Sequence, residues 1–319
     1  MPLRIVFCGT PAFALPSLRA LIADPDVRVE AVITQPDRPR GRGGEISISP
    51  VKAAAIESGI QVYQPEKIKS DAASDFLLRL APDVIVIIAY GQIISQRLLD
   101  IPRLGWVNVH ASLLPKYRGA APINWAIING ETRTGVTTMQ VNAGLDTGPI
   151  LLKSETHIGA DETAQSLAAR LAELGAPLIV ETLRKLARAE LTPQPQDDSH
   201  ASLAPLLKKE DGRIDWSLPA QAIYNRIRGL QPWPGAFTTF RGKTCHIWGR
   251  PVLEQGEKKV ETGTDASPGT IVVADRDLAV ACGGGTILEL EFVQLEGRKR
   301  ITVREFASGA RLSPSERFV

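Results

Sequence analysis

Trp106-Val107-Asn108-Val109-His110 is an apolar run closed by the turn-forming residues Ser112 and Pro115. A run of this length and composition predicts a buried strand. Because side chains alternate across a strand, Asn108 and His110 are expected to point to the same side. The strand would therefore present an amide donor and an imidazole together at one edge of the protein.

Strands and helices alternate on the N-terminal side of this run. Strands are predicted over Leu3–Cys8, Val27–Thr34, Ile60–Tyr63 and Asp83–Ala89, and helices over Phe13–Ala23, from Pro50 onward and over Ser70–Leu80. Such alternation predicts an α/β fold with a doubly wound, mostly parallel sheet, in which ligands bind at the carboxyl ends of the strands. The first strand is not followed by Gly-x-Gly-x-x-Gly, so the sequence does not support a pyrophosphate cradle.

A glycine-rich turn over Asn142–Pro149 places Asp146 between two predicted strands, Gly135–Val141 and Ile150–His157. An amide, an imidazole and a carboxylate can together bind an oxyanion, orient the imidazole and relay a proton, which suits acyl transfer. The pattern alone leaves another interpretation open. A strand-end Asn or His is often a turn cap or a hydrogen-bonded core residue, and Gly-x-Asp-x-Gly occurs in ordinary loops.

The C-terminal part of the chain has a different pattern. Helices are predicted over Ile123–Asn129, from Asp161 to Ala189 and over Pro219–Gly229. Short strands are predicted over Ala236–Arg241, Thr244–Trp248, Thr270–Val273, Leu278–Ala281, Ile287–Leu295 and Ile301–Glu305. The proline-rich residues 191–206 are interpreted as a linker. We therefore expect a domain over residues 1–206 and a smaller β-barrel over residues 207–319. Such barrels often bind nucleic acids, although a purely structural module is equally compatible with the pattern.

The composition is that of a globular protein, with 319 residues, 44% apolar and 23% charged residues, and a net charge of +2. The three cysteines are too few for a disulfide framework or a metal cluster, and Cys8 is expected to be buried and inert. The sequence enters its first strand without a signal-peptide pattern and has no apolar run of membrane-spanning length, so a cytoplasmic location is expected.

The segment Gln35–Glu45 is rich in proline, glycine and charge, and no regular element is predicted for it. It carries Arg38, Arg40 and Arg42. One interpretation is a disordered surface excursion. The other is a loop whose guanidinium groups bind the phosphates or the groove of a nucleic acid.

Several linked motifs carry a resemblance to a known family. They are Asn108-x-His110, Ser112-Leu113-Leu114-Pro115, the Arg-Gly-Ala-Ala-Pro-Ile run at 118–123, and Gly144-Leu145-Asp146-Thr147-Gly148. In this order they resemble the formyltransferase family that uses 10-formyltetrahydrofolate. The resemblance also covers residues 7–11, 35–43, 208–216 and 225–236, so it extends over both expected domains.

The resemblance implies that a formyl group is transferred from 10-formyltetrahydrofolate, as co-substrate, to the methionine amine of charged initiator tRNA. Asn108, His110 and Asp146 match the family's catalytic positions, and Ser112-Leu113-Leu114-Pro115 matches its folate-contacting loop. Arg38, Arg40, Arg42, Lys208 and Lys209 would face the tRNA. The implied fold is a Rossmann-like domain followed by an OB-like barrel. No metal, redox cofactor or obligate protein partner is expected.

The chain departs from the family at two adjacent positions in the arginine-rich loop. Related loops carry two lysines where this sequence has Gly44 and Glu45, which weakens the electrostatic attraction of the loop for tRNA. Lys116 and Arg118 are expected to be solvated, or to meet the folate tail or a phosphate. The alternatives are a nucleotide-sugar or glycinamide ribonucleotide formyltransferase, a 10-formyltetrahydrofolate hydrolase, and a non-enzymatic RNA-binding protein.

Overall fold

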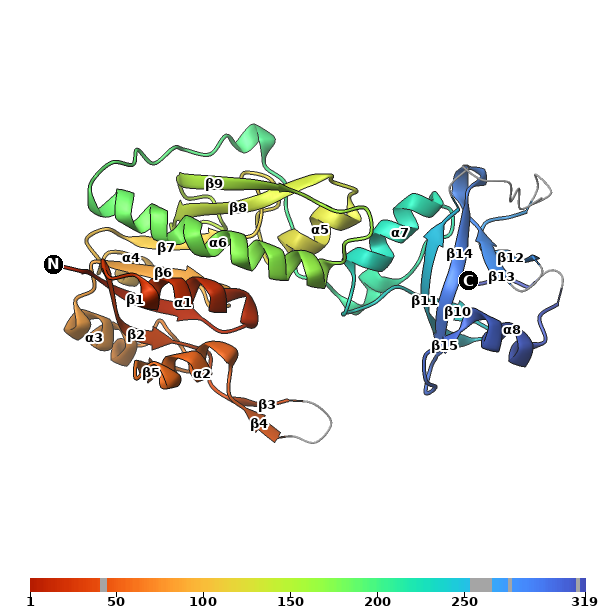
Figure 1. Cartoon of the computed structure of the whole chain (residues 1–319), viewed down its shortest axis with the longest axis horizontal. Coiled ribbons are helices and arrows are strands. Elements are labelled where there is room, and N and C mark those ends of the chain that lie inside the picture. Colours follow the sequence, from red (N-terminus) through yellow and green to blue (C-terminus); the bar gives the residue numbers. More distant parts are fainter. Residues whose placement is uncertain (41–44, 253–265, 275–276, 314–315) are drawn as a thin grey trace. The chain divides into compact units, whose positions relative to one another are not determined.

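The computed structural model describes residues 1–40, 45–252, 266–274, 277–313 and 316–319. The chain forms two compact units (Figure 1). The first unit comprises Met1–Pro122, Arg133–His157 and Ser166–Pro205, and the second comprises Ile123–Thr132, Ile158–Gln165 and Leu206–Val319. Each unit buries a hydrophobic core of its own.

A seven-stranded sheet forms the centre of the first unit, with the strand order β5-β2-β1-β6-β7-β8-β9. The strands are β1 (Leu3–Gly9), β2 (Val27–Ile33), β5 (Gln61–Tyr63), β6 (Val84–Ile88), β7 (Trp106–His110), β8 (Arg133–Gln140) and β9 (Ile150–His157). Pairing is parallel from β5 to β7, whereas β8 and β9 are antiparallel. The predicted mostly parallel sheet is therefore confirmed.

Helices cover both faces of this sheet. They are η1 (Ala12–Ala14), α1 (Leu15–Ala23), α2 (Pro50–Glu57), α3 (Asp71–Leu80), α4 (Gln96–Leu99) and α6 (Ala164–Ala187). The α3 and α4 helices pack on the face that buries Trp106. On the opposite face, a Cβ added to Gly175 of α6 would lie 3.1 Å from Val109 Cγ1, so α6 lies close to β7. This two-sided packing is what a doubly wound sheet requires.

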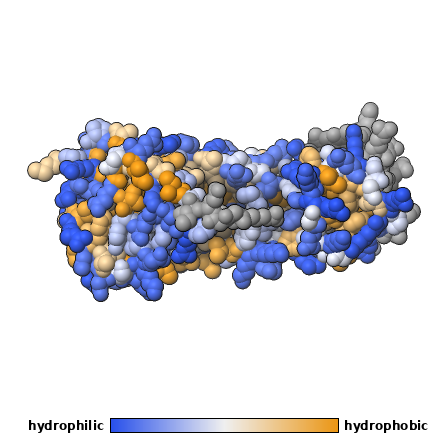
Figure 2. Space-filling view, turned by 90° about the horizontal axis from the view of Figure 1, so that it is seen from below, coloured by the Kyte–Doolittle hydropathy of each residue, from blue (hydrophilic) through white to orange (hydrophobic). Residues whose placement is uncertain are grey.

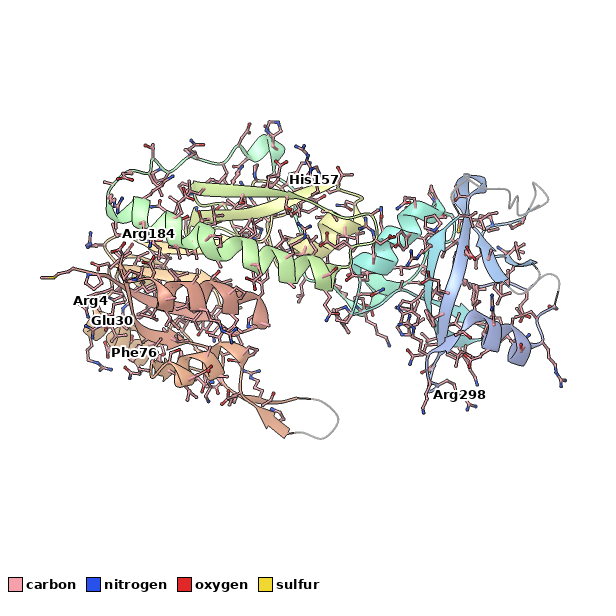
Figure 3. The ribbon with its side chains drawn as sticks, in the orientation of Figure 1. Arg4, Glu30, Phe76, His157, Arg184 and Arg298 are labelled. Carbon is pink, nitrogen blue, oxygen red and sulfur yellow. The ribbon has the colours of Figure 1, made fainter. Side chains whose placement is uncertain are left out.

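Side-chain contacts tie the edges of the first unit together (Figure 3). Arg4 of β1 forms an ion pair with Glu30 of β2 at 2.8 Å. Phe76 of α3 stacks on Tyr63 of β5, with ring centroids 4.3 Å apart. These contacts hold the β1, β2 and β5 side of the sheet, and β1 itself is buried along almost its whole length. The carboxyl ends of the strands are thus fixed on a rigid frame.

The segment for which no regular element was predicted contains a short antiparallel hairpin, which we call the arm. Its strands are β3 (Arg38–Arg40) and β4 (Glu45–Ser47), paired in register from Arg38 with Ser47 to Arg40 with Glu45. The prediction of an irregular loop is therefore wrong at both ends of the segment. Three-residue strands give too few alternating positions for a pattern to be seen in the sequence.

A curled antiparallel sheet dominates the second unit, with the order β10-β11-β14-β13-β12 and β15 paired to β14 (Figure 1). Its elements are α7 (Ala220–Gly229), β10 (Phe237–Phe240), β11 (Lys243–Pro251), β12 (Ile271–Ala274), β13 (Asp277–Ala281), β14 (Ile287–Leu295) and β15 (Ile301–Thr302). Trp216, Phe240, Phe306 and Phe318 meet in its core. The expected small β-barrel module is confirmed as this curled sheet.

The strand predicted over Ile301–Glu305 is wrong after its second residue. Helix α8 (Val303–Ala310) begins there instead. The Thr302 hydroxyl accepts a hydrogen bond from the Glu305 backbone nitrogen, and the Glu305 carboxylate accepts one from the Thr302 nitrogen. This reciprocal capping box favours a helix start over an extended chain. The Thr-x-x-Glu pattern was present in the sequence and was missed.

Two segments that precede the expected domain boundary belong to the second unit. Helix α5 (Pro122–Ile128) meets α7, where Asn124 Nδ2 donates to the Gly229 carbonyl at 2.8 Å. The buried Arg228 guanidinium donates to the carbonyls of Gly159 and Glu162, each at 3.1 Å. The second unit is therefore assembled from three separate parts of the chain.

Residues 191–206 were interpreted as a linker, but residues 191–205 belong to the first unit and run along it. Gln194 exchanges backbone hydrogen bonds with Ile150. Arg118 donates to the Ser202 carbonyl and accepts from the Ala204 nitrogen. We call this segment the strap. Its backbone is held by β9 and by the loop after β7, which places its side chains beside the end of β7.

Hydrophilic residues cover much of the molecular face drawn in Figure 2. Among the residues that the structure describes, no helix is long and apolar enough to cross a membrane.

Candidate active site

The centre of the site lies at the end of β7. Ile87 of β6 pairs with Asn108, and His110 pairs with Thr137 of β8, so β7 is held on both sides. Helix α6 covers the face of β7 on which Val109 lies, opposite to the face that carries Asn108 and His110. Asn108 and His110 are therefore carried by a strand whose position is fixed by three neighbouring elements.

The structure brings Asn108, His110 and Asp146 together, and we call these three side chains the trio. Asn108 Nδ2 lies 3.5 Å from Asp146 Oδ1, at the long limit of a hydrogen bond. His110 Nδ1 lies 3.7 Å from Asp146 Oδ2. The His110 side chain is 6% exposed and that of Asp146 is 18% exposed. One carboxylate thus meets an amide and an imidazole in a largely dehydrated place, where electrostatic contacts are stronger than in water.

The orientation of His110 follows from its second ring nitrogen. Nε2 lies 2.9 Å from the Tyr117 carbonyl oxygen. A carbonyl can only accept, so Nε2 carries the hydrogen, and Nδ1 is the ring nitrogen that faces Asp146. In the neutral imidazole Nδ1 is then an acceptor.

Asp146 is held in an uncommon backbone conformation, with φ at 50°. Tyr117, whose carbonyl orients His110, also has a positive φ of 63°. Such conformations cost about 1–3 kcal/mol each and persist only where surrounding contacts fix them. Here the Gly119 nitrogen donates to Asp146 Oδ2 at 2.9 Å. Strain is therefore concentrated at the two residues that meet His110.

Gln196 of the strap supports the Asp146 turn and was not identified from the sequence. Its Nε2 donates to the carbonyls of Asp146 at 2.8 Å and Gly148 at 2.7 Å. Its Oε1 accepts from Arg118 Nε at 3.0 Å and Nη2 at 2.8 Å. The strap thus fixes the turn that carries the carboxylate. A glutamine that follows a proline in a polar segment gave no sequence signal of this role.

Arg118 is buried, at 7% exposure, so the expectation of a solvated side chain is wrong. Its Nη2 also forms an ion pair with Asp198 at 2.7 Å. With Gln196 and Asp198 as partners, the guanidinium joins the loop after β7 to the strap. Lys116, in contrast, is exposed, and its backbone carbonyl accepts a hydrogen bond from the Ser112 hydroxyl at 2.6 Å.

The Ser112–Pro115 loop is well fixed beside the trio. Ser112 and Leu114 are completely buried. Thr137 Oγ1 donates to the Ser112 carbonyl at 2.7 Å, and Lys153 Nζ donates to the Leu114 carbonyl at 2.5 Å. The Ser112 hydroxyl is also bonded within the protein, because it donates to the Lys116 carbonyl. Leu113 and Pro115 keep partial exposure, and contact of this loop with a folate remains a prediction.

A cavity of about 590 Å³ opens at the carboxyl ends of β1, β2 and β6, the same sheet edge that carries the trio. Its lining is polar on several sides and includes Thr10, Gln35, Asp37 and Ser49 together with the backbone around Tyr90. Ligands of doubly wound sheets bind at this edge. The cavity is large enough for part of a nucleotide or a pterin-sized ring.

The residues expected to face tRNA are only partly described. Arg38 is 71% exposed and reaches Glu66 at 3.8 Å, a weak surface pair. Arg42 lies outside the described residues, as does the side chain of Arg40. Lys208 and Lys209 are exposed at the start of the second unit.

The described residues include no group of three or more His, Cys, Asp or Glu side chains that could hold a metal ion. Cys8, Cys245 and Cys282 are buried free thiols, and burial raises the pKa of Cys245 and of Cys282 to about 12. They are therefore unreactive at neutral pH.

Family comparisons identify both units of the chain. The family model described as "Formyl transferase" matches residues 3–183, and the model "Formyl transferase, C-terminal domain" matches residues 206–311. A methionyl-tRNA formyltransferase of Solibacter usitatus is 56% identical over 316 residues, covering 99% of this chain and 98% of the relative. The enzyme of that name from Geobacter sulfurreducens is 51% identical, covering 99% of this chain and 96% of the relative.

Solved structures show the same fold at lower identity. The sugar 3N-formyl transferase WlaRD, crystallised with dTDP and 5-N-formyl-THF, has a TM-score of 0.66 at 17% identity and covers 94% of this chain and 100% of its own. HypX from Aquifex aeolicus has a TM-score of 0.59 at 17% identity and covers 97% of this chain and 49% of its own. The resemblance noted in the sequence is confirmed, and the chain belongs to the formyltransferase family, among the methionyl-tRNA formyltransferases.

Proposed function

We propose that this protein transfers the formyl group of 10-formyltetrahydrofolate to the amino group of methionyl initiator tRNA. The observation that carries the proposal is the convergence of the trio at the carboxyl edge of the sheet, in a chain at least half identical to methionyl-tRNA formyltransferases. Because such a product starts translation, the proposal also implies a cytoplasmic location.

In the proposed reaction the neutral methionine amine attacks the formyl carbon. A carbon–nitrogen bond forms, the formyl oxygen becomes an oxyanion and the nitrogen becomes positive. Asn108 is assigned as a hydrogen-bond donor to the oxyanion, a contact whose loss typically costs about 10²–10³ in rate. His110 can be a second donor only from a protonated Nδ1, because its Nε2–H already donates to the Tyr117 carbonyl. The bond to the folate nitrogen then breaks as the oxyanion returns to a carbonyl, and that nitrogen takes up the proton that the attacking amine has lost.

Asp146 is assigned to the proton transfer. The new amine must lose a proton before the intermediate collapses, and a carboxylate beside a correctly oriented imidazole can accept it. The Nδ1 of His110 faces this carboxylate, so the proton can be shared between the two groups. The Gly119 nitrogen holds the carboxylate and Gln196 holds the Asp146 backbone carbonyl, so the carboxylate is already in place when substrate arrives.

A cluster of aromatic rings and cations on the sheet of the second unit supports the assignment of RNA as the acceptor. The Arg300 guanidinium lies 4.3 Å from the Trp248 ring centroid and 4.0 Å from that of Phe292. His246 lies between Trp248 and Phe237, with centroids 6.3 Å and 5.8 Å away. Aromatic rings interleaved with cations form a surface on which RNA bases and phosphates bind.

Cations continue along this part of the second unit. Arg298 and Lys299 precede Arg300 in the exposed turn after β14 (Figure 3). The pKa of His246 is lowered, first by its partial burial and then by the nearby Lys209. We propose that this surface, with Lys208 and Lys209, contacts the tRNA backbone. It supplies attraction that is not specific for sequence and depends on salt.

The deciding experiment supplies 10-formyltetrahydrofolate and charged initiator tRNA and measures formylmethionyl-tRNA. His110→Ala should abolish most of this activity, whereas His200→Ala serves as the matched control because His200 is 76% exposed. Formate release at the same rate without tRNA would point to the hydrolase instead. Formylation of an amino sugar nucleotide in preference to the tRNA would point to a sugar formyltransferase.

A further inference from the structure

The arm is fastened at its root by a compact polar cluster. It leaves the first unit at Asp37 and returns at Ser49, and both ends meet the first turn of α2. Lys52 Nζ forms an ion pair with Asp37 Oδ2. The Ser49 hydroxyl accepts from the Lys52 nitrogen at 3.1 Å. A single residue, Lys52, thus contacts both ends of the arm.

Gln64 completes this cluster, which we call the root clamp and which consists of Asp37, Lys52 and Gln64. Gln64 Oε1 accepts from Lys52 Nζ at 2.6 Å, and its Nε2 donates to Asp37 Oδ1 at 3.1 Å. The side chains of Lys52 and Asp37 are only 18% and 19% exposed. Charged groups with so little exposure are tolerated only while their ion pair and hydrogen bonds are intact. The cluster therefore favours a single relative placement of Asp37, Lys52 and Gln64.

A second set of hydrogen bonds joins the clamp to the sheet edge. Gln64 Nε2 donates to the Gln35 carbonyl at 2.8 Å, and Gln35 Nε2 donates to the Tyr90 carbonyl at 2.8 Å. Gln92 Nε2 donates to Gln35 Oε1 at 3.2 Å. Tyr90 follows β6, the strand whose Ile87 pairs with Asn108. The hydrogen bonds are therefore continuous from the arm root to the strand beside the trio.

We propose that Lys52 is a positioning residue that fixes the direction in which the arm leaves the sheet edge. The arm needs such a device, because a two-stranded hairpin with three residues in each strand is marginal on its own. The exposed pair between Arg38 and Glu66 adds little. The proposal rests on the function proposed above, since the direction of β3, which begins at the exposed Arg38, would decide how the arm meets the RNA.

A purely structural role in α2 does not account for the clamp. The helix is capped by Ser49 and anchored by the buried residues Val51, Ala54 and Ala55. None of these contacts uses the Lys52 ammonium. Its partners, Asp37 and Gln64, come from the segments after β2 and β5, so the ammonium joins the arm root to the sheet edge.

Lys52→Met is the direct test, with Lys69→Met as the matched control because Lys69 is an exposed lysine of the same unit. We expect Lys52→Met to speed amide exchange in the arm peptide by about tenfold, since local opening follows lost contacts. The kcat/KM for charged initiator tRNA should fall by about 10- to 100-fold, as for misplaced binding groups generally. The formate release without RNA should not change. Because Asp37 and Gln35 line the cavity, the Kd for the folate is measured in parallel, and a loss of folate affinity as large as the loss of kcat/KM would refute the positioning role.

A charge swap separates positioning from general destabilisation. Asp37→Lys combined with Lys52→Asp restores an ion pair, and the Gln64 amide can serve it after a flip. The swap should recover part of the protection of the arm amides from exchange and part of the rate of tRNA formylation. The recovery is partial because the flipped Gln64 amide no longer donates to the Gln35 carbonyl. Unchanged arm exchange and tRNA rate in Lys52→Met would refute the clamp. Absence of tRNA formylation by the unmodified protein would refute the proposed function, while arm exchange would still test the clamp.

Discussion

Replacing Gln196 should damage both the stability and the turnover of this protein. Gln196→Leu removes two donations to the carbonyls of the Asp146 turn and two acceptances from Arg118. Neutral hydrogen bonds contribute about 0.5–1.5 kcal/mol each and those to charged groups about 1.5–3 kcal/mol. Because Gln196 is half-buried, the low ends apply, and the free energy of unfolding should fall by about 4 kcal/mol.

The effect on turnover follows from the backbone of Asp146. Its φ of 50° is kept by surrounding contacts, and without Gln196 the turn can relax. A displacement of about 1 Å costs roughly 10²-fold in rate, so kcat should fall by about 10- to 100-fold with little change in the KM for tRNA. Urea denaturation and single-turnover formylation measure the two effects.

Two further variants locate the cause. Gln196→Glu keeps acceptors for Arg118 but has no donors for the two carbonyls, so it should keep more stability than Gln196→Leu while still losing turnover. Gln96→Leu is the control, because this exposed glutamine bonds only Asp100 among its described partners, and its effect should stay within about 0.5 kcal/mol. If the Gln196→Leu variant has the same unfolding free energy and kcat as the unmodified protein, the strap does not support the site.

Three other outcomes are expected. Single and double replacements within the trio should be strongly non-additive in kcat, because side chains that act on one transition state are not independent; losses that multiply would contradict this. Arg300→Met should weaken tRNA binding and lower the slope of log Kd against log salt by about 1, whereas the exposed Arg188→Met should leave the slope unchanged. Lys52 lowers the pKa of Asp37, so this carboxylate stabilises the fold above its unfolded-state pKa of about 3.9 and loses that contribution as the pH falls through the folded-state pKa. The difference in unfolding free energy between the unmodified protein and Lys52→Met should accordingly shrink on acidification; a difference independent of pH would mean that the ion pair does not contribute.

The sequence predicted those parts of the site that are carried by local periodicity. The alternation in Trp106–His110 placed Asn108 and His110 on one side of a strand, and the glycine-rich turn marked Asp146. These signals come from residues close together in the chain. The same holds for the parallel sheet, whose strands are strongly apolar.

The parts that were missed depend on contacts between distant segments. Gln196 and Arg118 acquire their roles only when the strap lies beside the loop after β7, and a polar proline-rich segment does not reveal its docking position. The arm has strands too short for a period to be detected. The start of α8 depends on residues close together in the chain. Its capping box is visible in the sequence, but the alternating apolar residues of Ile301–Glu305 predict a strand instead.

The course of the strap also sets where this protein can be recombined with its relatives. A chimera joined near residue 191, where the composition changes, would import a foreign segment in place of Gln196, Asp198, Ser202 and Ala204. A junction after Pro205 keeps all of these partners with the strands and loops that they support. Exchange of the C-terminal domain between species should therefore succeed only when the donor sequence begins beyond the strap, even though the composition changes earlier, at the start of the proline-rich segment.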